Sequence, residues 1–152
     1  MIAAAWPSYD RGVVPEATLK QTDAGLIPAS PGWFVLNACD SRWNEKPGQG
    51  FSLPLTGGDE YEAEMFFPML GLAIRVVNPG EPTTAYHWET EQEDFLVLAG
   101  EAVLIIEGQE RLLRQWDFVH CPPKTKHAFA GAGEGPCVLL CASSRQFQKD
   151  GP

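Results

Sequence analysis

The chain has 152 residues, of which 44% are hydrophobic and 20% are charged, a composition typical of one globular domain and unlike that of a disordered chain. Twenty acidic residues against eleven basic ones give a formal net charge of −9, and the sequence contains no cluster of Lys and Arg. Because nucleic-acid binding needs a positively charged surface, this charge pattern argues against a nucleic-acid partner.

The sequence indicates neither a secretory signal nor a membrane span. The first six residues are apolar, but no positive charge precedes them and Pro7 and Asp10 follow closely, so we expect no signal peptide. No apolar run reaches the length of about 20 residues that a membrane-spanning helix needs. The four cysteines, Cys39, Cys121, Cys137 and Cys141, have no CxxC spacing. We interpret them as buried, reduced thiols of a cytoplasmic protein, and leave open one disulfide between distant cysteines.

The first half of the chain has little regular pattern. Residues 1–32 contain four prolines and are predicted to form an irregular N-terminal arm. Trp33–Asn37 is the first predicted strand and begins the main domain, residues 33–145. Lys46–Gly58 is rich in proline and glycine and is predicted to be one long loop. Residues 146–152 are expected to form a C-terminal tail.

From Leu72 onward, strand-like segments alternate with Gly and Pro turn signals every eight to twelve residues. The predicted strands are Leu72–Asn78, Thr84–Glu89, Asp94–Leu98, Ala102–Glu107, Glu110–Leu113, Asp117–Cys121, His127–Ala130 and Pro136–Ala142. This spacing predicts an all-β sandwich or closed barrel.

The three histidines, His87, His120 and His127, all lie in the second half of the chain, close to acidic residues or prolines. Side chains two residues apart on a strand share a face, so His87 and Glu89 are expected to point the same way. Glu93 has the same parity, but an unbroken strand would place it about 20 Å from His87, whereas ligands lie about 2 Å from a shared ion. The chain must therefore turn at residues 90–92 if His87 and Glu93 bind one metal ion.

The segment from Gly80 to Gly100 resembles the first cupin motif, G-x5-HxH-x3–4-E-x6-G, with Glu93 at the position of its glutamate. One extra residue lies between Gly80 and His87, and Glu89 stands where the second histidine usually is. The resemblance to cupins covers about half of the chain and implies an all-β double-stranded β-helix, which is a jelly-roll barrel.

The segment from Trp116 to His127 is similar to the second cupin motif, G-x5-PxG-x2-H-x3-N, and Pro122 and His127 occupy matching positions. Trp116, Lys124 and Gly131 replace the two glycines and the asparagine of the motif. The turn geometry in this segment is therefore less well defined by the sequence than the position of the histidine.

The resemblance implies one divalent metal inside the barrel, bound by residues that carry over as His87, Glu89, Glu93 and His127. Two imidazoles and two carboxylates suit Fe, Mn, Zn or Ni. If Glu89 is not a ligand, the other three residues form the two-histidine, one-carboxylate set of non-haem iron oxygenases. Glu89 then has the role of a general base, or forms a salt bridge or lies at the rim of the barrel.

By the same resemblance, the expected function is that of a metal-dependent enzyme acting on a small polar molecule, either a dioxygenase or a sugar or carbonyl isomerase. The alternatives are a cupin that binds a small ligand without turning it over, and a structural dimer with a vestigial site. A homodimer is expected from the family and from outward-facing Tyr86 and Trp88. Light scattering tests this expectation, and a monomeric mass at micromolar concentration contradicts it.

Three other polar side chains are placed by pattern alone. His120 is expected in the core or beside a metal ligand, and Glu91 is expected to be solvated at the turn before Glu93. Arg75 alternates with apolar residues and is expected to face outward, although an inward Arg75 would reach an anionic substrate.

Overall fold

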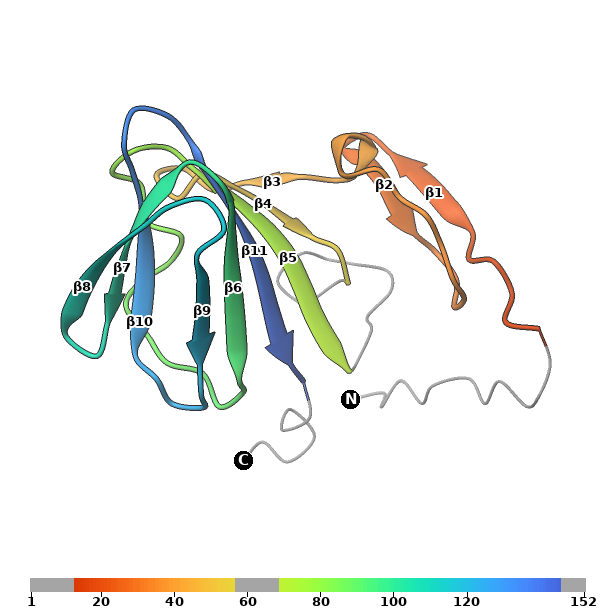
Figure 1. The fold of residues 1–152 in the computed structure, drawn as a ribbon. Helices are drawn as coiled ribbons and strands as arrows, with labels where there is room; N and C mark the ends of the chain where they lie inside the picture. The colour runs from red at the N-terminus through yellow and green to blue at the C-terminus, as the bar shows by residue number, and fades with distance from the viewer. Residues whose placement is uncertain (1–12, 57–68, 146–152) are drawn as a thin grey trace.

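The N-terminal part of the structure is a β-hairpin that stands beside the barrel (Figure 1). The computed structural model describes residues 13–56 and 69–145. Strands β1 (Leu19–Thr22) and β2 (Gly25–Pro28) pair antiparallel. Between them, the Thr22 hydroxyl donates to the Gly25 carbonyl and accepts from the Ala24 N–H. The sequence-based prediction of an irregular arm omits this hairpin, whose first strand is mostly polar and whose turn is at Asp23 and Ala24.

The predicted strand Trp33–Asn37 is wrong. Trp33 makes one isolated bridge, to Glu16, and residues 34–37 belong to no strand. Val35 is 82% exposed, so this apolar side chain is not buried against a sheet. A short 3-10 helix, η1 (Ala38–Asp40), follows, and the Asn37 side chain caps it by accepting from the Cys39 N–H.

The prediction of an unbroken loop over Lys46–Gly58 is also wrong. Strand β4 (Phe51–Pro54) lies inside this range and forms a hairpin with β3 (Asn44–Glu45), which ends just before it. Strand β4 also pairs with β5. Gly50 enters β4 with φ +71, and a Cβ there would lie 2.1 Å from the Val76 carbonyl oxygen. The glycine is therefore needed because β5 approaches closely at this point, and it does not indicate a loop. Gly57 and Gly58 lie outside the described residues.

Two antiparallel sheets form the jelly-roll barrel, as the sequence predicts (Figure 1). Besides β3 and β4, their strands are β5 (Leu70–Val77), β6 (Glu93–Ala99), β7 (Glu101–Ile106), β8 (Gln109–Leu113), β9 (Phe118–Cys121), β10 (His127–Ala132) and β11 (Cys137–Ser144). The larger sheet has the order β3-β4-β5-β11-β6-β9, and the smaller has the order β10-β7-β8. Seven of the eight strands predicted from Leu72 onward are confirmed, with small shifts at their ends.

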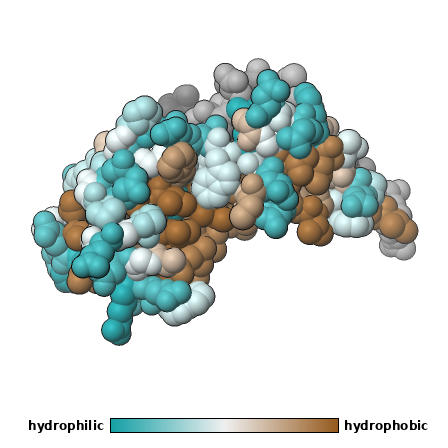
Figure 2. Space-filling view, turned by 90° about the horizontal axis from the view of Figure 1, so that it is seen from above, coloured by the Kyte–Doolittle hydropathy of each residue, from teal (hydrophilic) through white to brown (hydrophobic). Residues whose placement is uncertain are grey.

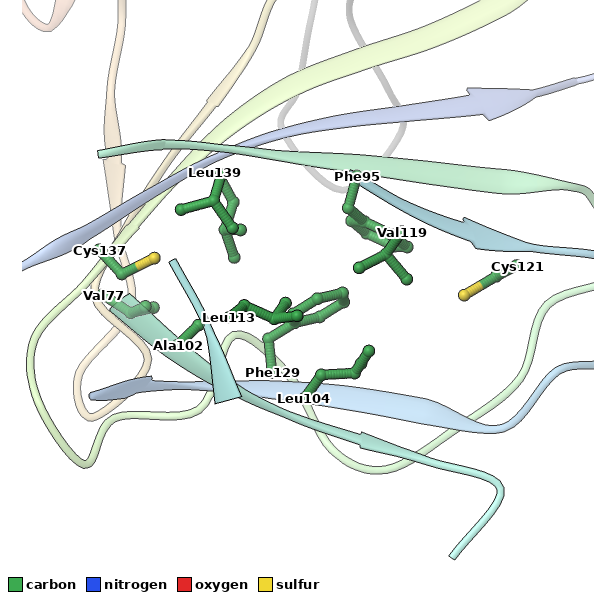
Figure 3. Close-up of a cluster of buried hydrophobic side chains, with 11 residues drawn as sticks. Val77, Phe95, Ala102, Leu104, Leu113, Val119, Cys121, Phe129, Cys137 and Leu139 are labelled. Atoms are coloured by element: carbon green, nitrogen blue, oxygen red, sulfur yellow. The ribbon is translucent and has the colours of Figure 1, made fainter. Parts of the chain in front are cut away.

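The hydrophobic core lies between the inner faces of these two sheets (Figure 3). Its buried residues are Val77, Phe95, Val97, Ala102, Leu104, Leu113, Val119, Cys121, Phe129, Cys137 and Leu139. Burial of this apolar surface provides the main stabilisation of the barrel. Cys121 and Cys137 belong to this core, whereas Cys39 is exposed, so the interpretation of four buried thiols fails at Cys39. In the described parts of the chain, no helix is long and apolar enough to span a bilayer.

The predicted strand Thr84–Glu89 is wrong: this segment contains bends, and it and the residues before it join β10 only at isolated bridges. Pro82 pairs with Ala130, and His87 pairs with His127. Bends at residues 84 and 86 interrupt pairing within the segment, and Pro79 and Pro82 before it have no N–H group to donate to a ladder. The segment nevertheless lies along the edge of the smaller sheet, and this position brings His87 beside His127.

Apolar side chains also remain at the surface. Seen from above, they gather on both sides of the hollow between the barrel and the N-terminal hairpin (Figure 2). Tyr86 and Trp88 are each 46% exposed, in agreement with their expected outward direction. The Tyr86 hydroxyl accepts a hydrogen bond from the Gly108 N–H, which fixes this ring against the turn between β7 and β8.

Candidate metal centre

Three separate segments bring His87, Glu93 and His127 together at one end of the barrel. Glu93 is the first residue of β6, and its backbone partners are Cys121 on β9 and Ser143 on β11. His127 is the first residue of β10, on the opposite sheet. His87 comes from the segment that precedes β6. The turn expected between His87 and Glu93 is therefore present, and Glu93 begins a new strand.

The two histidines are fixed by their backbones and by their rings. The His127 N–H donates to the His87 carbonyl at 2.8 Å, and the His87 N–H donates to the His127 carbonyl at 3.2 Å. The Nδ1 atom of His87 lies 2.8 Å from the Ala85 carbonyl, and that of His127 lies 3.0 Å from the Thr125 carbonyl. Because a carbonyl only accepts, each neutral ring carries its proton on Nδ1. Both Nε2 atoms then have a free lone pair, as metal ligands require.

One ligand atom from each of His87, Glu93 and His127 lies within 4.8 Å of the other two. His127 Nε2 is 3.3 Å from Glu93 Oε2, and the two imidazole rings are 5.1 Å apart between centroids. Two imidazole nitrogens and one carboxylate oxygen are the donors that bind borderline divalent ions such as iron, manganese, zinc and nickel. The residues present therefore fit the metal that the sequence predicts.

The electrostatics of this cluster favour a bound cation. Burial raises the pKa of Glu93 to about 7, and the nearby carboxylates of Glu89 and Glu91 add to the shift. Burial also lowers the pKa of His127; the neighbouring His87 acts in the same direction, while the Thr125 carbonyl and Glu89 oppose it. A divalent ion would offset both the repulsion among the carboxylates and the cost of burying a charged Glu93.

Glu89, the fourth predicted ligand, lies next to this group but outside it. Its Oε1 atom is 3.4 Å from His87 Nε2, and its side chain is 48% exposed. The Glu89 carbonyl accepts a hydrogen bond from the Lys124 N–H, which ties the turn after β9 to the segment that holds His87. Glu89 is therefore placed at the solvent side of the cluster.

Two other predictions are wrong. Glu91 is buried rather than solvated: its Oε2 accepts from the Thr90 hydroxyl, and its Oε1 has no hydrogen-bond partner among the described residues. His120 is neither in the core nor at the metal centre. It lies on the outer face of β9, 50% exposed, with Nδ1 2.6 Å from Asp94 Oδ1. Glu91 is buried and helps to raise the pKa of Glu93. The sequence gives no signal for this role, because the burial of Glu91 depends on how the chain packs.

The two residues that replace the glycines of the second motif have the backbone conformation that glycine favours. Trp116 has φ 75° and Lys124 has φ 69°, both in the left-handed region. This conformation costs roughly 1–2 kcal/mol for a residue with a Cβ. The turn after β9 thus retains the geometry that delivers His127, although Lys124 stands where a glycine is usual.

Comparison with known proteins agrees with this geometry. The family model described as the cupin domain matches residues 73–143, which contain all the strands from β6 to β10 and all three clustered residues. Residues 73–143 form a cupin domain. The matched range covers most of the barrel, whereas the N-terminal hairpin and the barrel strands β3 and β4 precede it.

Relatives of known sequence or structure share this cupin domain. An uncharacterized protein of Methanocaldococcus jannaschii is 28% identical over 72 residues, which are 47% of this chain and 58% of that protein. An RmlC-like cupin from Shewanella frigidimarina has a TM-score of 0.60 at 15% identity, covering 75% of this chain and 92% of that one. A protein of Acidithiobacillus ferrooxidans, provisionally named a sugar phosphate isomerase, has a TM-score of 0.58 at 24% identity, covering 73% and 74%. The structural similarities show a shared fold.

Proposed function

We propose that the cupin domain binds one divalent metal through His87 Nε2, a Glu93 oxygen and His127 Nε2, and isomerises a small polar molecule by proton transfer. The observation that carries this proposal is the convergence of three ligand atoms from three segments of the chain. The hydrogen bonds that direct both Nε2 atoms toward the cluster support it. Iron, manganese, zinc and nickel all suit this donor set.

Glu89 is the general base in this proposal. When bound, the metal would supply Lewis-acid polarisation of a substrate carbonyl oxygen, which would acidify the neighbouring C–H group. The Glu89 carboxylate, beside His87 and open to solvent, takes the proton from that carbon. Glu89 then delivers a proton, which exchanges with solvent at its exposed carboxylate, to the adjacent carbon. The hydroxyl proton moves to the former carbonyl oxygen, so the isomerisation needs no oxidant or reductant. We prefer this role to that of a fourth ligand, because the Glu89 side chain is not among the clustered ligand atoms of His87, Glu93 and His127.

The similarity to the Acidithiobacillus ferrooxidans protein supports the isomerase assignment at the level of the fold. A second candidate function is dioxygenase chemistry, which the set of two histidines and one carboxylate favours. Oxygen consumption by the iron-loaded protein with catechols, diketones and thiols separates this candidate from the isomerase. Metal binding with neither oxygen consumption nor proton exchange would instead fit a cupin that only binds its ligand.

Glu89→Gln tests the proposed base directly. We expect the variant to keep its metal and to lose proton transfer by about 10²–10⁴-fold, the usual contribution of a positioned general base. The measurement is deuterium incorporation from D₂O into a panel of aldoses, ketoses and their phosphates, beside metal content by mass spectrometry. Glu110→Gln, an exposed glutamate on β8, is the matched control. Wild-type exchange rates in Glu89→Gln would remove Glu89 from the mechanism.

A further inference from the structure

Arg75 faces the interior of the barrel, contrary to the outward direction that the sequence favours. Arg75 pairs directly with Leu139 across β5 and β11, and directly paired residues share a face of the sheet. Leu139 is fully buried in the core, and so is Val77, two residues from Arg75 on the same strand. On its other side, Arg75 pairs with the buried Ser52 of β4. The Arg75 side chain therefore leaves the wall of the larger sheet on its inner face.

The charge of Arg75 has no anionic partner among the described residues. The ion pairs found there join His87 to Glu89, His120 to Asp94 and His127 to Glu93. Arg75 is partly buried and flanked by apolar core residues, and a guanidinium in such a place normally has a carboxylate or phosphate beside it. The inward guanidinium of Arg75 is thus suited to bind an anionic group of a ligand.

The inner face connects Arg75 to the metal centre. Glu93 lies two strands from Arg75, because β11 is between β5 and β6. On β11, Glu93 pairs with Ser143, which is four residues from Leu139, the partner of Arg75. These steps separate the two Cα atoms by about 16 Å on a flat sheet and by less on a curved one. Both side chains leave the same inner face, so this separation suits a small ligand held between them.

Cys141 lies between the two groups on this face. Its thiol lies on the inner face of β11, between the strands that carry Arg75 and Glu93. Burial raises the pKa of Cys141 to about 12, the charge of Arg75 acts in the lowering direction, and the charge of Glu93 raises it. One buried thiol therefore senses both the arginine and the metal-site carboxylate.

We propose that Arg75 is the specificity-determining residue of this site and binds the oxyanion of a small anionic polyol whose other oxygens reach the metal centre. A planar guanidinium forms paired, charge-assisted hydrogen bonds with carboxylates and phosphates alike. The inference rests on the proposed function for the role of the metal end, and it adds the chemical class of the substrate.

Three compounds with the same three-carbon skeleton test this assignment on the metal-loaded full-length protein: glycerol, glycerate and glycerol 3-phosphate. Ligand-detected NMR titration gives the affinity for each. We expect at least one of the two anions to bind about tenfold or more tightly than glycerol, the usual effect of one charge-assisted contact. The preferred anion distinguishes a carboxylate substrate from a phosphate ester. Arg75→Met should remove this preference and leave the weak affinity for glycerol unchanged.

Arg111→Met is the matched control, because Arg111 is exposed on β8 and its guanidinium donates hydrogen bonds to Gln109 and Glu110 of the same strand. Methionine fits the apolar surroundings of Arg75, so Arg75→Met should melt at or above the wild-type temperature with its metal content unchanged. Retention of the anion preference in Arg75→Met, or equal or absent binding of all three compounds by the wild type, overturns the proposal. A substoichiometric metal content with an Arg75-dependent anion preference would instead contradict only the metal-dependent function.

Discussion

His127→Ala should lower the affinity for divalent metals by at least about a hundredfold. Loss of a residue that merely orients a metal ligand already costs about 10–100-fold, and this substitution removes a ligand itself. The His127 side chain is 3% exposed and its Nε2 lies 3.3 Å from Glu93 Oε2, so no other described side chain replaces it from the same position. Competition titration against a metal chelator measures the loss.

His120→Ala is the control for this experiment. His120 is an exposed histidine on the outer face of β9, where it pairs with Asp94, and its removal should leave the metal affinity unchanged. Since the His127 ring also packs against Phe95, at 5.2 Å between centroids, circular dichroism must show that His127→Ala is folded. Unaltered metal affinity in a folded His127→Ala would show that the second cupin motif is aligned wrongly on this chain.

Gly131→Ala should destabilise the fold and weaken metal binding, although it changes no ligand. A Cβ at Gly131 would lie 2.2 Å from the carbonyl oxygen and 2.7 Å from the carbonyl carbon of Asn78. The Gly131 backbone also accepts from the Gly80 N–H and donates to the Glu81 carbonyl, which fastens the segment that leads to His87. Forcing these backbones apart should cost about 1–3 kcal/mol in the free energy of unfolding.

Urea unfolding and metal titration of Gly131→Ala measure the two effects. Gly135→Ala is the matched control, because a Cβ at Gly135 meets nothing within 4 Å. Wild-type stability together with wild-type metal affinity in Gly131→Ala would mean that the contact with Asn78 does not position His87.

The sequence predicts the barrel well because its signals are local. Turn residues separate short apolar segments from Leu72 onward, and seven of these segments are strands. The three clustered site residues are also predicted, since each occupies a position in a spaced motif. The Thr84–Glu89 segment shows the limit: its composition is typical of a strand, but bends interrupt it, and its bridge to β10 is the isolated pair His87 and His127.

Side-chain environment is predicted less well, because it depends on which face packs against the second sheet. Arg75 shares its strand with residues of both faces, and only the pairing with Leu139 shows that it points inward. The same reason explains Glu91, buried by its neighbours, and His120, exposed on the outer face. The β1–β2 hairpin was missed because its four-residue strands carry little periodic pattern.

The metal content of the wild-type protein tests the central claim most directly. The protein should be purified without added ions and kept near pH 8, above the pKa of about 7 of Glu93, so that this carboxylate is ionised in the metal-free form. We predict one iron, manganese, zinc or nickel ion per chain, and a stabilisation of about 4 kcal/mol when free metal reaches a thousand times its dissociation constant. Substoichiometric metal, together with a melting temperature unchanged by excess Mn(II), Zn(II) or Fe(II), would contradict the account.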